Sequence, residues 1–375
     1  MKARILPLLF LVAAWLPLAS ADRPVTKFEK EITETYNIDA NGRVRLDNRY
    51  GEIKVSTWTQ SKVKINVLIQ VDARDEDAFQ DVLDRIDIGL SGNGSTVSAV
   101  TSISSNRRSD SWWSLLTGGS SSDDFKIYYD VTLPASVSLE VEARYCDVQL
   151  PSLTGETFLD IGYGDLVAGR LSNRTQMEIS YGSARVDRIG DNSTLEFRYS
   201  EGIIRNAGDL RYDGRYSEVR FGTTGVLRLD VGYDEIDVTS AKEVYLEGNY
   251  NELAVEEAGA VYIDGNYTDI NLGVISQGVR FDGNYGDLEI ERLVSGFSFV
   301  TVDASYSDIQ INVDEDAGYQ LDLRARYGDI SAPTDGLSPR NVGSESSSEY
   351  VKGTKAGNGN GRITISTNYG DIDLY

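Results

Sequence analysis

Acidic side chains recur at one place in a tandem repeat, and they are the residues of this sequence best placed to do chemistry. Each copy of the repeat centres on a tyrosine, and the second residue after it is acidic in twelve of thirteen copies. If the copies stack as strands roughly 4.8 Å apart, their carboxylates form one row. The row could bind Ca²⁺, or its oxygens could accept backbone N–H groups at turns, which we favour. The acidic residues are Glu52, Asp147, Asp165, Glu201, Glu218, Glu235, Glu252, Asp269, Asp287, Asp308, Asp329 and Asp371, and Ser183 takes their place in the remaining copy.

The usual nucleophile and base pairs are missing. The sequence has no histidine, which excludes Ser-His-Asp and Cys-His catalysis and histidine-ligated metal sites. Cys146, the only cysteine, directly follows a repeat tyrosine and has no histidine to activate it. The glycines lie in the repeats and not in a phosphate-binding loop of known spacing. We therefore expect no enzyme, and no catalytic, cofactor-binding or metal-binding residue.

A polysaccharide-active hydrolase or lyase is the enzymatic alternative, because paired carboxylates also serve glycoside hydrolases. Such enzymes build their clefts from long loops between coils. The repeats between Tyr145 and Tyr285 are too short to contain such a loop.

The repeat fills the chain from residue 143 to the C-terminus, with one earlier copy in the segment NRYGEI. Segments such as IGYGDL, GNYTDI and TNYGDI recur every 17 or 18 residues up to Tyr285, and then at spacings of 21, 21 and 42. Self-similarity at a fixed short period is typical of solenoids. The repeat tyrosines are Tyr50, Tyr145, Tyr163, Tyr181, Tyr199, Tyr216, Tyr233, Tyr250, Tyr267, Tyr285, Tyr306, Tyr327 and Tyr369.

Each copy reads as two short strands joined at the tyrosine. In one copy Val261, Ile263 and Tyr267 alternate with polar residues, and Ile270 and Leu272 resume the alternation. Period two indicates a strand with one buried face. This parity predicts that the tyrosine points into the core, with small residues two positions earlier making room for its ring. The alternative is an exposed aromatic strip that stacks on sugars.

These strands predict an all-β fold, a parallel β-solenoid in which each coil covers the next. We expect residues 22–140 to form a strand-rich N-terminal cap with one helix near 75–86, where Asp75 is a candidate N-cap. Residues 141–375 are expected to form about twelve coils of 17–21 residues, with a polar loop at 338–361.

One apolar loop stands apart from the repeat. Trp112 and Trp113 lie in a Ser- and Gly-rich stretch between Asn106 and Asp124. The loop could fold over the first coil as a plug, which we favour, or present the indoles to a partner.

The N-terminus indicates export. Within residues 1–21, Lys2 and Arg4 precede an apolar run, and small residues precede Asp22, as in a secretory signal peptide. The expected location is the periplasm, the cell surface or the extracellular space, and no transmembrane segment is expected in the mature chain.

Without residues 1–21 the chain has 34 Lys and Arg against 59 Asp and Glu, a net charge of −25. Such a surface repels nucleic acid.

The strand-rich head followed by tandem units, from NRYGEIKV through GNYGDLEI to TNYGDIDL, resembles the bacterial putative-adhesin family of exported β-strand-repeat proteins. Many members of that family carry serine where this chain carries tyrosine. The tyrosine in each unit therefore resembles a tyrosine-rich branch of the family. The resemblance implies a β-solenoid placed in the cell envelope and supplies no catalytic residues.

Together these features predict a non-enzymatic, adhesin-like binding or spacer scaffold of the cell envelope. A structural or regulatory envelope component with a protein partner is a further alternative. The ligand, protein or glycan, is not identified by the sequence, and end-to-end association of rods stays open.

Overall fold

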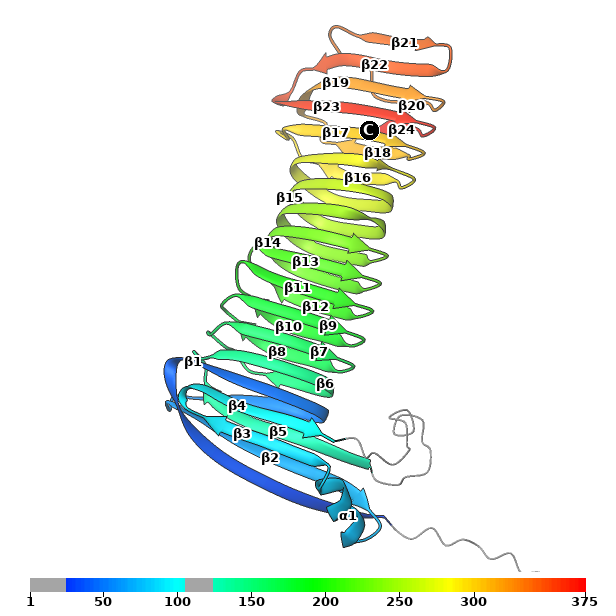
Figure 1. The fold of residues 1–375 in the computed structure, drawn as a ribbon. Coiled ribbons are helices and arrows are strands. Elements are labelled where there is room, and N and C mark those ends of the chain that lie inside the picture. Colours follow the sequence, from blue (N-terminus) through cyan, green and yellow to red (C-terminus); the bar gives the residue numbers. More distant parts are fainter. Residues whose placement is uncertain (1–24, 105–123) are drawn as a thin grey trace, which may run out of the picture.

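The computed structural model describes residues 25–104 and 124–375 and shows one long, nearly all-β rod (Figure 1). The expected signal peptide at 1–21 and the Trp112-Trp113 loop lie outside the described residues. The N-terminal elements are β1 (Thr26–Trp58), β2 (Lys62–Ala73), α1 (Glu76–Leu83), β3 (Ile86–Gly92), β4 (Gly94–Ile103), β5 (Asp124–Pro134) and β6 (Ser138–Leu150). The middle strands are β7 (Thr157–Gly162), β8 (Asp165–Leu171), β9 (Thr175–Ser180), β10 (Ser183–Ile189), β11 (Ser193–Arg198), β12 (Glu201–Asn206), β13 (Leu210–Arg215), β14 (Glu218–Gly232) and β15 (Glu235–Asn284). The last strands are β16 (Leu288–Leu293), β17 (Phe299–Ser305), β18 (Ile309–Val313), β19 (Ala317–Arg326), β20 (Ile330–Ser331), β21 (Asn341–Glu345), β22 (Ser348–Lys355), β23 (Asn358–Asn368) and β24 (Ile372–Leu374).

Successive coils pair as parallel strands, which confirms the predicted β-solenoid. β11 pairs in register with β9 on one side and with β13 on the other, and β12 likewise lies between β10 and β14. Each coil turns once at its tyrosine, between a strand such as β11 and the next strand, β12. The hydrogen bonds therefore run along the rod axis, from coil to coil.

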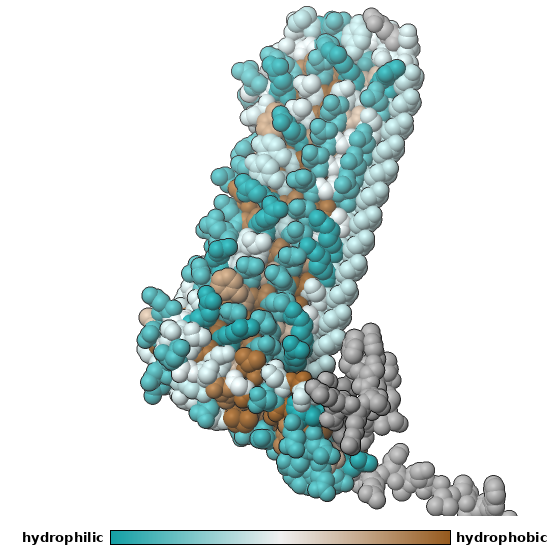
Figure 2. Space-filling model, viewed as in Figure 1, coloured by the Kyte–Doolittle hydropathy of each residue, from teal (hydrophilic) through white to brown (hydrophobic). Residues whose placement is uncertain are grey.

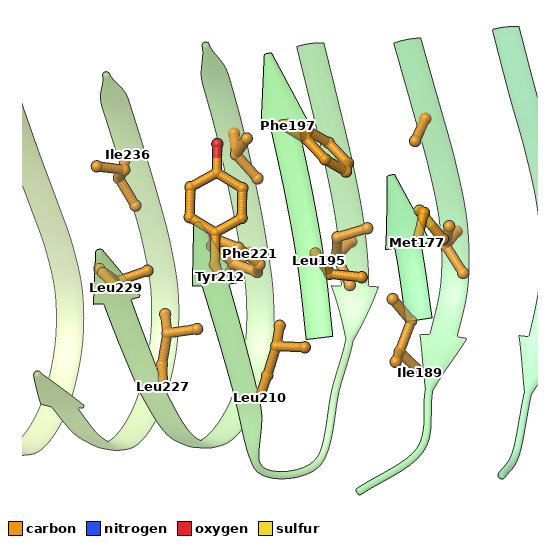
Figure 3. Packing of buried hydrophobic residues seen from close by; sticks show 14 of the residues in the cluster. Met177, Ile189, Leu195, Phe197, Leu210, Tyr212, Phe221, Leu227, Leu229 and Ile236 are labelled. Atoms are coloured by element: carbon orange, nitrogen blue, oxygen red, sulfur yellow. The ribbon is translucent and has the colours of Figure 1, made fainter. Parts of the chain in front are cut away.

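The core is a continuous apolar column inside the coils. Alternate residues point inward, and the large rings of Phe197, Tyr212 and Phe221 pack edge to face with centroids 5.6–5.7 Å apart (Figure 3). Such aromatic pairs contribute on the order of 1 kcal/mol each beyond simple burial.

The N-terminal copy of the repeat forms the first coil of the rod. Residues 43–54 of β1 pair in parallel with residues 138–149 of β6. Residues 26–37 of β1 pair antiparallel with β2, which pairs antiparallel with β5. On its other side the copy pairs in parallel with β4 and β5. The first copy of the repeat is therefore stacked on the coil that begins at residue 138, although the two are far apart in the sequence.

One short helix covers this end, as predicted. Asp75 caps α1, because its side chain accepts a hydrogen bond from the Ala78 N–H at 2.9 Å. The apolar face of the helix packs on β1 through Phe79 and Phe28, whose stacked rings lie 5.2 Å apart. This face adds Ala78, Phe79, Val82 and Leu83 to the apolar core.

The C-terminal coil is inserted out of sequence order. β23 pairs in parallel with β17 on one side and with β19 on the other, and β24 lies between β18 and β20. The ladder order is therefore Tyr306, Tyr369, Tyr327. The last coil in the sequence is the second-to-last in space. The 42 residues from Tyr327 to Tyr369 are enough for the chain to return to this position.

The segment expected as a polar loop at 338–361 is largely ordered as strands, and this expectation is corrected. β21 and β22 form an antiparallel hairpin, and β22 pairs antiparallel with β19. At this end of the rod an antiparallel hairpin replaces a further coil. Apolar alternation is weak there because little of this hairpin is buried.

Candidate functional site: a ridge of stacked tyrosines

The repeat tyrosines stand on the surface, and the prediction that they point into the core is wrong. All thirteen have left-handed backbone conformations, with φ between 52° and 63°. From Tyr163 to Tyr369 their exposed fractions lie between 46% and 52%, and Tyr50 is 36% exposed. A left-handed residue turns the chain sharply, so the alternation that holds along the strand does not continue through the corner.

The residue after the tyrosine takes the buried place in most copies. Cys146, Ser217 and Thr268 are buried at this position, and glycine occupies it in six copies. A Cβ on Gly286 would overlap the carbonyl oxygen of Thr268 in the coil below. Where the residue two positions before the tyrosine is small, it has a different role from the one predicted. A Cβ on Gly283 would overlap the backbone of the neighbouring coil and approach the Phe281 ring.

The rings stack into one continuous ladder, which we call the tyrosine ridge. Neighbouring centroids are 4.7–5.3 Å apart and the ring planes differ by 2–13°. Figure 2 shows a narrow, regular ridge along one edge of the rod. Each stacked pair contributes on the order of 0.5–1.5 kcal/mol, which offsets the strained corners.

The stacking decides what the ridge can bind. A sugar or another flat ligand stacks on a free ring face, but each ring face within the ridge is covered by the next ring. At the ends, Phe125 packs against Tyr50 and the Arg326 guanidinium lies 5.1 Å from the Tyr327 centroid. The ridge therefore offers ring edges and hydroxyl groups, and its geometry does not support sugar stacking.

The acidic row divides into two classes, of which the aspartates are part of the fold. The Asp147 carboxylate accepts the Asp165 N–H at 3.0 Å, and the Asp287 carboxylate accepts the Asp308 N–H at 2.9 Å. The same bond joins Asp371 to Asp329 at 2.8 Å. The prediction that these oxygens accept backbone N–H groups is confirmed for six of the seven aspartates, with the donor in the next coil, and Asp329 is the exception.

The glutamates have no such bond. In the coils of Glu201, Glu218, Glu235 and Glu252, the side chain of the residue just after the tyrosine accepts an N–H from inside the corner. Ser217 accepts from Ser200 at 3.2 Å, and Asn251 accepts from Asp234 at 3.1 Å. The carboxylates of Glu201, Glu218, Glu235 and Glu252 are thus free of the backbone and exposed or half-exposed. Only Glu218 forms an ion pair with another described residue, Arg220.

A shallow groove lies on each side of the ridge. The first, the glutamate groove, has a volume of about 820 Å³ and is lined by Tyr199, Tyr216 and Tyr233 together with Glu201, Glu218 and Glu235. The second, on the opposite flank, has about 540 Å³ and contains Arg215 in addition to Asp230, Glu247 and Asp264. Arg215 pairs with Asp230 at 2.9 Å, so this flank is partly neutralised.

One corner buries a carboxyl group. Asp234 is 3% exposed, its carboxylate accepts the Ser217 N–H at 2.9 Å, and Tyr212 Oη lies 3.4 Å away. Burial raises the pKa of Asp234 from 3.8 to about 6, against the opposing effect of the Ser217 hydrogen bond.

Asp234→Asn is expected to stabilise the protein at neutral pH. Because the folded pKa is raised, the stabilising contribution of Asp234 is present below pH 3.8 and is lost as the pH rises through about 6. A shift of this size corresponds to at most about 3 kcal/mol. Chemical denaturation of both proteins between pH 4 and 8 measures the effect, with Asp264→Asn, at an exposed side chain, controlling for net charge. An unchanged slope with pH in Asp234→Asn would contradict this assignment.

Asp287→Ala is expected to cost roughly 1 kcal/mol, because the Asp308 N–H loses its acceptor. Asp287→Asn keeps an oxygen in that place and should change stability by less than about 0.5 kcal/mol. Since the carboxylate accepts a backbone hydrogen bond, replacing EDTA by millimolar calcium should not change the melting temperature of the wild-type protein or of Asp287→Asn. A rise of many degrees in calcium that the Asn variant abolishes would show a metal site.

The other candidate groups of the described residues are buried or do not converge. Cys146 is 1% exposed, and burial raises the pKa of its thiol to about 12. Within residues 25–104 and 124–375, no three acidic or cysteine side chains converge as the ligands of a metal ion would. In the same part of the chain, no helix is long and apolar enough to cross a membrane.

The chain belongs to the Toastrack DUF4097 family, whose model matches residues 102–375. The predicted resemblance is confirmed at the level of this family, and the tyrosine-rich branch stays a prediction. No curated protein matches the chain.

Solved structures with low similarity span most of the chain. A putative cell adhesion protein from Clostridium sporogenes is 9% identical and covers 92% of this chain and 99% of its own, with a TM-score of 0.19. A putative lipid binding protein and a putative adhesin, both from Parabacteroides distasonis, are 11% and 10% identical. They cover 76% and 78% of this chain and 97% and 98% of their own, with TM-scores of 0.27 and 0.28. These values are too low to transfer a ligand or an activity.

Proposed function

We propose that this protein is a non-enzymatic, adhesin-like binding scaffold of the cell envelope and that the tyrosine ridge is its binding surface. The signal-peptide pattern at residues 1–21 supports export. The absence of histidine from the sequence and the shallowness of both grooves support a binding role over an enzymatic one.

The observation that carries the proposal is the continuous exposure of the ridge. A left-handed corner needs only glycine or asparagine, and a tyrosine there costs on the order of 1 kcal/mol or more. The chain nevertheless places tyrosine at thirteen corners and exposes about half of almost every ring. An exposed aromatic surface of this length, on a rod with little other exposed apolar area, is typical of an interaction surface.

Capture of envelope fragments tests the proposal. The immobilised mature chain is compared with the variant Tyr216→Ser, Tyr233→Ser, Tyr250→Ser. A matched control is Tyr245→Ser, Tyr262→Ser, which removes a stacked pair (4.6 Å) that lies off the ridge. We expect the ridge variant to lose roughly tenfold or more in capture, as binding hot spots do, and the control to keep it. Equal capture by both variants, with folding verified by circular dichroism, would contradict the proposal.

A further inference from the structure

The structure points to a partner chemistry for one flank of the ridge, and this inference rests on the proposed function. We propose that the glutamate groove binds an extended lysine- or arginine-rich segment of a partner protein, lying along the rod axis. The carrying observations are the two unlike walls of the groove and the glutamates that the fold itself does not use.

The first step concerns charge. The groove is lined by Glu201, Glu218 and Glu235 with Asp165, and none of its lining residues is basic. The aspartates of the acidic row hold the next coil, but the glutamates make no backbone bond. In the coil beyond, Glu252 continues the row. Burial and the neighbouring Glu218 and Glu252 carboxylates raise the pKa of Glu235, so these charges repel one another.

The second step concerns shape. The glutamates stand one to a coil and do not converge on a point, which disfavours a single metal ion. From Glu201 to Glu252 there are three coil steps, or roughly 14 Å. An extended peptide places every second side chain on one side, roughly 6.7 Å apart, so three basic residues span the four glutamates.

The third step concerns the side chain that fits. One wall of the groove consists of tyrosine ring edges and hydroxyls, and the other of carboxylates. Lysine and arginine have apolar stems and charged ends. Their stems can lie along the ring edges while the charged ends reach the glutamates. A second copy of this chain is a poor occupant, because its own net charge of −25 repels the groove.

The test uses the full mature chain and a labelled octalysine peptide at neutral pH and about 50 mM salt, where exposed charges are weakly screened. The variant Glu201→Gln, Glu235→Gln, Glu252→Gln leaves the ridge and the paired Glu218 in place. The matched control Glu247→Gln, Asp264→Asn, Asp282→Asn removes the same charge from the opposite flank of the same ridge. We expect the groove variant to bind octalysine at least tenfold more weakly and the control to change less than threefold.

Three outcomes would overturn the proposal. Equal weakening in both variants would show attraction to net charge alone. No binding by the wild-type chain would show that the groove takes no basic peptide. Spermine or calcium that displaces octalysine at an equal concentration of charge would show a site for small cations.

The proposed function can fail separately. If the groove variant captures envelope fragments as well as the wild-type chain while the ridge variant does not, the ridge binds its partner without this groove. If the wild-type chain captures nothing, the proposed function itself is wrong.

Discussion

Gly286→Ala is expected to lower the free energy of unfolding by roughly 3 kcal/mol, the upper part of the range for overpacked cores. The new Cβ would overlap the Thr268 carbonyl oxygen, which belongs to the backbone of the neighbouring coil. No side-chain rotation relieves such an overlap, so the two coils must separate at the corner.

Gly89→Ala is the matched control. It lies in β3, and the nearest atom to its new Cβ would be the Val100 carbonyl oxygen at 3.8 Å, an ordinary contact. This change should alter stability by less than about 0.5 kcal/mol. Urea denaturation measures both variants, and a Gly286→Ala protein as stable as wild type would show that the coils are not so closely spaced.

Removing residues 358–375 is expected to release the C-terminal end of the rod while the lower coils stay folded. β23 is the strand that joins β17 to β19, and Tyr369 joins Tyr306 to Tyr327. Since each coil of a solenoid contacts only its neighbours, the coils below β17 keep their contacts. Residues 317–355 should become sensitive to protease.

A chain that stops after residue 314 is the control for this deletion. Both shortened chains should melt at similar temperatures, because the same coils remain folded in each. Limited proteolysis with mass spectrometry follows residues 317–355 directly. Their continued resistance in the chain lacking 358–375 would show that the coil at 317–331 stacks directly on the coil at 299–313, making the inserted coil dispensable.

The sequence predicts the solenoid well because its repeat is local and regular. Alternation at Val261, Ile263, Ile270 and Leu272 identifies the two strands of a coil, and all four residues are buried. Asp75 and the apolar spacing after it identify the helix. These signals depend on neighbouring residues only, so they can be recognised without knowledge of the tertiary structure.

The corner could not be read from the same alternation. Extending it to Tyr267 gives a buried ring, whereas the left-handed conformation at that residue moves the buried place to Thr268. Tyrosine is a rare residue in that conformation, so its type gives no warning. One signal was present: glycine, serine or asparagine follows most of the tyrosines, as a crowded corner requires.

The insertion of the C-terminal coil depends on the tertiary structure and could not be predicted from the repeat. Tyr327 follows Tyr306 by 21 residues, which suits direct stacking, and the only sign of the insertion is the spacing of 42 before Tyr369. The glutamates and aspartates of the acidic row are likewise similar in sequence. Their separation into carboxylates that accept an N–H from the next coil and carboxylates that do not is visible only in the structure.

Hydroxyl-radical footprinting of the tyrosines, with and without envelope fragments, tests the central claim that the ridge is an exposed binding surface. In the free protein we expect the ridge tyrosines to be oxidised readily, and Tyr129 and Tyr212, at most 1% exposed, to resist oxidation. Envelope fragments should then protect a contiguous set of ridge tyrosines and leave Tyr245 and Tyr262 reactive. Ridge tyrosines as unreactive as Tyr129 in the free protein, or equally reactive with and without envelope fragments, would contradict the account.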